Sequence, residues 1–247
     1  MHNTRTRQSL PIALLGIALA ACGGGNNIES IAPDVSTPAP PPDARFEVTV
    51  TNLTNAQPLS PVAIIAHRGE YQAFTIGEAV TVGMESLAEG GDNGDLIAEA
   101  ESTAGVLAAA SGVAPIGPGG SETVEISVNP GTTDALRLSL ATMLVNTNDA
   151  ISGAPDIDVG GMAVGEQARH FAIAYDAGTE ANTEAAGTIP GPAVGGEGFN
   201  AARDDIADRV SMHPGVISNE TGLATSVLSA QQRFDNPVLS FTVTRLE

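Results

Sequence analysis

The chain has 247 residues, of which 29 are acidic and ten are basic, and it contains no lysine. The net charge of -19 excludes nucleic-acid binding and direct attraction to anionic lipid, because both depend on a cationic surface. An acidic surface of this kind suits cations and solubility, and a general acidic bias of the proteome would give the same composition.

The first 21 residues predict a lipoprotein signal peptide. Arg5 and Arg7 precede an apolar run from Leu10 to Ala21, which is too short to span a ~30 Å hydrocarbon core. The run ends in Leu-Ala-Ala before Cys22, where bacterial lipoproteins are cleaved and lipidated. Gly23 follows instead of Asp, which by resemblance to those lipoproteins favours the outer membrane. We expect a lipid anchor on Cys22, facing the periplasm or the cell surface; otherwise Cys22 is a stray thiol.

A flexible tether is expected between the anchor and the folded domain. Residues 22–45 are rich in Gly, Asn, Ser and Pro, a composition typical of a semi-extended linker. Cys22 is the only cysteine, so the mature chain forms no internal disulfide and needs a sizeable core or a bound metal. The remaining residues, 46–247, are expected to form one domain.

Alternating and β-branched segments predict strands along the domain. The expected strands cover residues 46–52, 62–66, 122–128, 138–145 and 238–246. A helical pattern covers 83–104, with a Gly-Gly-Asp-Asn-Gly break before a second helical piece over 95–107.

Residues 150–235 are rich in Gly, Ala and Pro, with weak periodicity, and predict long loops with a short helix over 201–210. No repeat of 20–50 residues appears, which argues against a solenoid or propeller. We therefore predict a mainly β fold, an antiparallel β-sandwich with short helices and long Gly-rich loops.

No established catalytic motif is present, and we expect no enzyme activity. His67, His170 and His213 could act as a base or bind zinc, but their spacing matches no local zinc-ligand pattern, and structural histidines are the favoured interpretation. A hydrolase with a diffuse site in the 150–235 loops stays open as a further alternative.

Oxygen ligands offer a stronger signal. Asp149 follows the expected strand 138–145 directly, and a second acidic turn carries Asp176 and Glu180 around a glycine. Calcium takes 6–8 oxygen ligands from carboxylates, carbonyls and waters, so two such loops at one end of a sandwich could share an ion. Asp and Asn are also ordinary turn formers. The Asp92-Asn93-Gly-Asp95 turn gives a weaker signal of the same kind.

Several segments together resemble the spondin N-terminal domain. They are Phe-Glu-Val-Thr-Val-Thr-Asn at 46–52, Glu-Ser-Leu-Ala-Glu-Gly-Gly-Asp at 85–92, Ser-Leu-Ala-Thr-Met-Leu-Val at 139–145 with Asn-Asp at 148–149, Asp-Ala-Gly-Thr-Glu at 176–180, and Phe-Asp-Asn-Pro at 234–237. The resemblance spans residues 46–247 and is patchy between 185 and 233.

The resemblance implies a C2-like variant of the β-sandwich with calcium held by loops at one edge. It makes Asp149 and Asp176 the expected ligands, and Glu180 stands where the family has Asp. We expect an extracellular binding or adhesion module whose partner is a surface protein or a glycan, with the membrane reached through Cys22. An envelope lipoprotein in which calcium serves stability alone is the alternative. Matrix partners such as integrins do not carry over, because the animal members' cysteines and further modules are missing.

Overall fold

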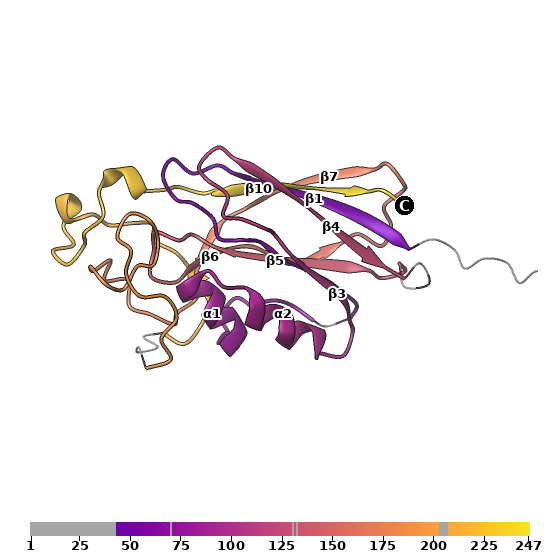
Figure 1. The fold of residues 1–247 in the computed structure, drawn as a ribbon, viewed down its shortest axis with the longest axis horizontal. Helices are drawn as coiled ribbons and strands as arrows, with labels where there is room; N and C mark the ends of the chain where they lie inside the picture. The colour runs from indigo at the N-terminus through magenta and orange to yellow at the C-terminus, as the bar shows by residue number, and fades with distance from the viewer. Residues whose placement is uncertain (1–42, 70, 130, 132, 203–206) are drawn as a thin grey trace, which may run out of the picture. The chain divides into compact units, whose positions relative to one another are not determined.

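The computed structural model describes residues 43–247 except 70, 130, 132 and 203–206. The expected signal peptide, Cys22 and nearly all of the tether lie outside the described residues. Ala44 and Arg45, which the predicted tether includes, belong to the first strand instead. Two antiparallel sheets pack face to face, and this confirms the predicted β-sandwich (Figure 1).

The first sheet has four strands in the order β4-β1-β10-β7. Its strands are β4 (Ser121–Val128), β1 (Ala44–Asn52), β10 (Leu239–Arg245) and β7 (Gln167–Ala172). In β1, buried and partly exposed residues alternate without interruption, because one face meets the core and the other meets solvent. Phe46, Val48 and Val50 therefore point inward from β1, opposite Val243 and Phe241 of β10.

The second sheet has six strands in the order β3-β2-β5-β6-β8-β9. They are β3 (Val106–Ser111), β2 (Ala63–His67), β5 (Arg137–Met143), β6 (Ala150–Asp158), β8 (Ala174–Asp176) and β9 (Ser211–Met212). All residues of β2 are buried, because the other sheet covers one of its faces and two helices cover the opposite face. This burial explains the continuous apolar pattern of its sequence.

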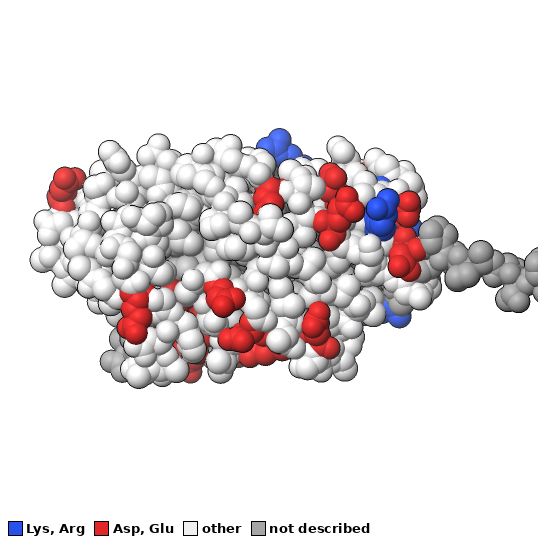
Figure 2. Space-filling model, viewed as in Figure 1, with Lys and Arg blue, Asp and Glu red and all other residues white. Residues whose placement is uncertain are grey.

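Two short helices cover the outer face of the six-stranded sheet. Helix α1 (Val82–Gly90) starts at Thr81, whose hydroxyl accepts a hydrogen bond from the Met84 amide, and ends at Gly91 with φ +73°. Helix α2 (Gly94–Glu101) follows after the predicted glycine break. Figure 2 shows acidic side chains gathered along the side of the domain that these helices occupy in Figure 1. Two single-turn helices, η2 (Asn219–Thr221) and η3 (Ala230–Gln232), lie in the C-terminal loops.

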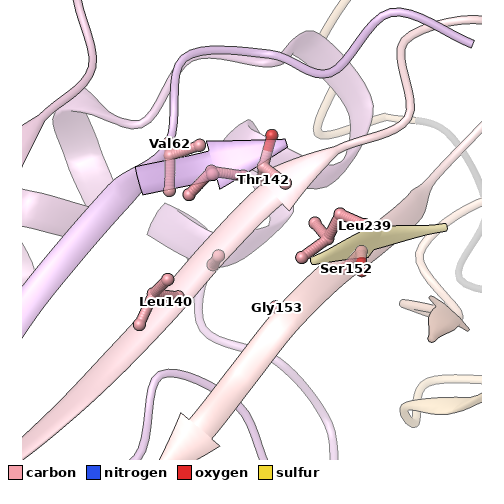
Figure 3. Close-up of a pocket in the computed structure, with 8 residues that line it drawn as sticks. Val62, Leu140, Thr142, Ser152, Gly153 and Leu239 are labelled. Atoms are coloured by element: carbon pink, nitrogen blue, oxygen red, sulfur yellow. The ribbon is translucent and has the colours of Figure 1, made fainter. Parts of the chain in front are cut away.

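Gly153 sets the close approach of β5 and β6 in the middle of the sandwich. It has φ +147°, and a Cβ there would lie 2.0 Å from the Leu140 carbonyl oxygen. The pairing register shifts between Leu138 and Leu140, as expected for a β-bulge. Figure 3 shows the gap between the sheets beside Gly153, which is too narrow for a water molecule.

The loop prediction for residues 150–235 is wrong in its first third. Strands β6, β7 and β8 lie there, and β9 follows further on. Small and polar residues interrupt their alternation, so no clear period of two appears, and pairing with neighbouring strands decided their conformation. The second helical piece is also shorter than predicted, because Val106 already starts β3. The predicted helix over 201–210 falls partly outside the described residues, and Val210 forms a β-bridge with Ile76.

Candidate metal site

The two acidic loops predicted from the sequence meet at one end of the six-stranded sheet. Asp149 immediately precedes β6, Asp176 is the last residue of β8, and Ala150 pairs with Asp176 in the sheet. Beyond β8 the chain turns back, and the amides of Thr179 and Glu180 donate to the Asp149 side chain. The fold thus brings Asp149, Asp176 and Glu180 into one cluster.

Asp149 is fully buried, yet only one of its two carboxylate oxygens is satisfied. Oδ2 accepts hydrogen bonds from the amides of Thr179 at 2.9 Å and Glu180 at 3.1 Å. Oδ1 accepts none from any described residue. A buried acceptor without a donor costs roughly 1–3 kcal/mol. The position of Oδ1 therefore calls for a proton, a water molecule or a cation.

Asp176 is held by the turn that follows it. Its Oδ1 accepts from the Gly178 amide at 2.9 Å, and its Oδ2 accepts from the side-chain amide of Asn182. Gly178 has φ +80°, and a Cβ there would lie 2.5 Å from the carbonyl oxygen of Arg209. Only glycine fits both conditions, so this residue fixes the path of the acidic turn.

Glu180 is joined to the first loop through its side chain. Its Oε2 accepts from the Asn148 amide at 3.0 Å, and the same amide group donates to Thr188 at 2.9 Å. The carbonyl oxygen of the Asn148 side chain accepts from the Glu184 amide. Asn148 therefore links the two acidic loops and a third loop beyond them.

The electrostatics of the cluster oppose the charged form of Asp149. Burial, and after it the nearby Asp176 carboxylate, raise the pKa of Asp149 to about 7, although the neighbouring backbone amides of residues 178–180 act in the opposite direction. A divalent cation would reverse this balance, because it favours the ionised carboxylate.

His213 lies at the edge of the same cluster, which the sequence did not predict. Its Nδ1 accepts from the Gly215 amide at 2.9 Å, and its ring packs on Phe234 with centroids 5.4 Å apart. Burial lowers the pKa of His213 to about 4, although the Asp176 carboxylate acts in the opposite direction. The imidazole is therefore neutral at physiological pH, and its Nδ1 lone pair is already engaged.

Two observations bear differently on a bound metal. No group of three or more His, Cys, Asp or Glu side chains in the described part of the chain is arranged to hold an ion. The bare, buried Oδ1 of Asp149 nevertheless offers a ligand atom without a protein donor. Fewer than three acidic side chains do not exclude calcium, because calcium also accepts backbone carbonyls, amide oxygens and waters as ligands. The Asp149 cluster therefore fits a calcium ion if backbone carbonyls, amide oxygens or waters supply the remaining ligands of its coordination shell.

The other two histidines lie apart from this cluster. His67 shares a hydrogen bond of 2.9 Å with the Ser139 hydroxyl inside the six-stranded sheet, and its ring contacts Tyr71. His170 stacks on Phe241 with centroids 5.0 Å apart. These contacts are those of structural histidines.

The weaker Asp92–Asp95 signal corresponds to a helix-linking turn. Asp92 accepts from the Gly94 amide at 2.9 Å, and the Asn93 amide donates to the Pro61 carbonyl and the Ser111 hydroxyl. These hydrogen bonds connect the two helices to the sheet, and they account for the residue types at this turn.

No protein-family model matches the chain, and no curated protein matches it. Among the described residues, no helix combines the length and the apolar character that crossing a bilayer requires.

Proposed function

We propose that this protein is a lipid-anchored envelope protein whose β-sandwich binds one calcium ion at the Asp149 cluster and acts as a surface binding or adhesion module. The observation that carries the calcium site is the fully buried Asp149 carboxylate, whose Oδ1 has no donor among the described residues. The resemblance to the spondin N-terminal domain supports the same ligands, Asp149 and Asp176, with Glu180 as a third. The anchor on Cys22 and an outer-membrane location belong to the proposal and rest on the N-terminal sequence.

Calcium bound there would neutralise the repulsion between Asp149 and Asp176 and join the two loops. The amides of Thr179 and Glu180 keep the Asp149 side chain oriented, and the turn at Gly178 keeps Asp176 in place. The role of the ion in this proposal is to fix the loops at this end of the sandwich, and binding rather than catalysis is the proposed activity.

A pocket of about 480 Å³ next to the same loops supports the binding role. Its walls are four prolines, three glycines and Val145, an apolar lining in which the prolines restrict the backbone. The loop from Val145 leads directly to Asp149, and the Asn146 side chain accepts from the amide of Ala193, which follows the Pro190–Pro192 segment that also lines the pocket. Calcium that fixes this loop would therefore also fix one wall of the pocket.

Isothermal titration calorimetry tests the calcium site directly. The mature chain, prepared with Cys22→Ser to avoid lipidation and stripped of metal, should bind one calcium ion. Asp149→Asn and Asp176→Asn should each abolish the heat of binding, whereas Asp43→Asn, which removes the same charge from an exposed position, should not change it. Wild-type protein that gives no binding heat with millimolar calcium would overturn the assignment.

Chelation separates the binding module from the purely structural alternative. A pull-down from envelope extracts with and without EDTA should lose its partner while circular dichroism still reports the folded sandwich. If the fold and the binding disappear together, calcium serves stability alone.

A further inference from the structure

The outer face of the four-stranded sheet is a surface of hydroxyl groups. Because alternate residues of each strand point inward, the intervening ones form this face. It carries eight serines and threonines, namely Thr49, Thr51, Ser121, Thr123, Ser127, Ser240, Thr242 and Thr244. Seven of them are at least partly exposed, and Ser240 is buried. We call it the hydroxyl face.

The strand register arranges six of these residues, together with Arg169 and Phe171, in two rows across the sheet. The first row is Thr123, Thr49, Thr242 and Arg169, and the second row is Ser121, Thr51, Ser240 and Phe171. Neighbouring strands lie about 4.8 Å apart, and residues two apart on a strand are separated by about 6.7 Å. Each row therefore extends about 14 Å, which is long enough for an extended polymer rather than a single small molecule.

Hydrogen bonds between neighbouring strands hold part of these hydroxyls in fixed positions. Thr49 and Thr123 are joined at 2.9 Å, and Thr51 and Ser121 are joined at 2.8 Å. Each such pair still offers one hydroxyl hydrogen and three lone pairs to a ligand. The face can therefore both donate and accept hydrogen bonds, and the inter-strand hydrogen bonds preorganise its hydroxyl groups for a ligand.

An exposed aromatic ring ends the second row. Phe171 keeps 61% of its surface exposed, although the chain contains only six Phe and two Tyr in total. The Arg169 guanidinium lies 5.1 Å from the centre of the Phe171 ring and also donates to the Ser240 hydroxyl at 3.3 Å. The preference of threonine and phenylalanine for strands accounts for much of this composition. The feature specific to this face is that the exposed ring shares a register row with the hydroxyls and lies beside Arg169.

The charge of this face differs from that of the rest of the molecule. Arg45 and Arg169 balance Glu47 and Glu125 on its strands, whereas the whole chain carries a net charge of -19. The helices on the opposite side are acidic (Figure 2). A neutral ligand can approach the hydroxyl face without repulsion, and a strongly anionic one is repelled by the protein as a whole.

We propose that the hydroxyl face binds a neutral polysaccharide laid across the strands, with a sugar ring stacked on Phe171. The C–H groups of a sugar carry partial positive charge and match the negative face of an aromatic ring, and its hydroxyls match both capacities of the Ser/Thr rows. This proposal gives the binding module a ligand class, but it uses a surface other than the calcium cluster and its pocket.

Native affinity electrophoresis of the mature Cys22→Ser chain tests the proposal. The gels contain dextran, hydroxyethylcellulose or galactomannan as neutral polymers, or polygalacturonate as an anionic one. We expect at least one neutral polymer to retard the protein, with EDTA making no difference. Phe171→Ser should weaken that retardation roughly tenfold, the upper range of an aromatic contact. The pair Thr49→Val and Thr242→Val, which keeps the β-branched shape, should weaken it as well.

Matched controls separate the hydroxyl face from general effects. Val82→Ser changes a residue with the same 61% exposure on α1, and Thr75→Val removes an exposed hydroxyl away from the sheet; both should bind as the wild type does. Equal melting temperatures establish that the variants are folded. Any of three results would overturn the proposal. They are retardation by none of the neutral polymers, retardation by polygalacturonate alone, and unchanged binding of Phe171→Ser. Binding that EDTA abolishes would place the ligand at the calcium cluster instead. The calorimetric test of calcium is unaffected by any of these results.

Discussion

Replacing Asp149 by Asn should make the calcium-free protein more stable above pH 7. Asn keeps an oxygen for the Thr179 and Glu180 amides and removes the buried negative charge. In the unfolded chain Asp149 ionises near its ordinary pKa of 3.8, whereas in the folded chain its pKa is raised to about 7. The folded state therefore loses stability as pH rises through this window, by at most about 4 kcal/mol.

The size of the effect follows from the length of the domain. For a protein of 150–250 residues, about 1 kcal/mol corresponds to roughly 2–4 °C in melting temperature. At pH 8 in EDTA, Asp149→Asn should therefore melt up to about 8–16 °C above the wild type, and at pH 4 the two should nearly coincide. Calcium at a hundredfold excess over Kd should raise the wild-type stability by about 2.7 kcal/mol and leave the variant unchanged.

His213 adds a second, opposite pH dependence that the variant uncovers. Its pKa is lowered from 6.5 to about 4, so its contribution to stability is complete above pH 6.5 and is lost as pH falls toward 4. In the wild type the gain from Asp149 offsets this loss over the same range. In Asp149→Asn the loss remains alone, and the melting temperature should fall on acidification from pH 6.5 to 4.

Differential scanning calorimetry between pH 4 and 8, with EDTA or calcium, measures all of these differences. Asp43→Asn is the control for loss of one acidic charge at an exposed position. The reasoning is refuted if Asp149→Asn melts below the wild type at pH 8 in EDTA, or if it keeps the calcium-dependent increase.

Three further outcomes follow from the structure and the sequence. Gly178→Ala should destabilise the protein by at least about 1–3 kcal/mol, because its φ of +80° and its contact with the Arg209 carbonyl exclude a side chain; Gly161→Ala, which meets nothing within 4 Å, should be near neutral in the same urea titration. The calcium affinity should fall up to tenfold per pH unit below pH 7 in calorimetric titrations, because calcium competes with a proton on Asp149. Cys22→Ser should leave the protein outside the membrane fraction, and mass spectrometry should find an acylated N-terminus only in the wild type; an unmodified wild-type N-terminus would contradict the anchor.

The sequence by itself determined the elements whose pattern is long and regular. Strands β1, β4 and β5 were predicted from the alternation in residues 46–52 and 122–128 and from the apolar run at 138–145. Burial of one or both faces of a strand determines which of its residues are apolar, so these patterns can be recognised in the sequence. The Gly-Gly-Asp-Asn-Gly break separated α1 from α2 for a similar local reason, since Gly91 takes the left-handed conformation at the end of a helix.

Only the tertiary structure decided the short strands and the contents of the acidic cluster. In strands β6 to β9, small and polar residues interrupt the alternation, and the conformation depends on a paired neighbour, so the local sequence carried little information about them. The sequence predicted Asp149, Asp176 and Glu180 as a set, but their meeting depends on the pairing of β6 with β8. The approach of His213 and the bare Oδ1 of Asp149 arise from contacts between segments far apart in the chain, and no spacing in the sequence encodes such contacts.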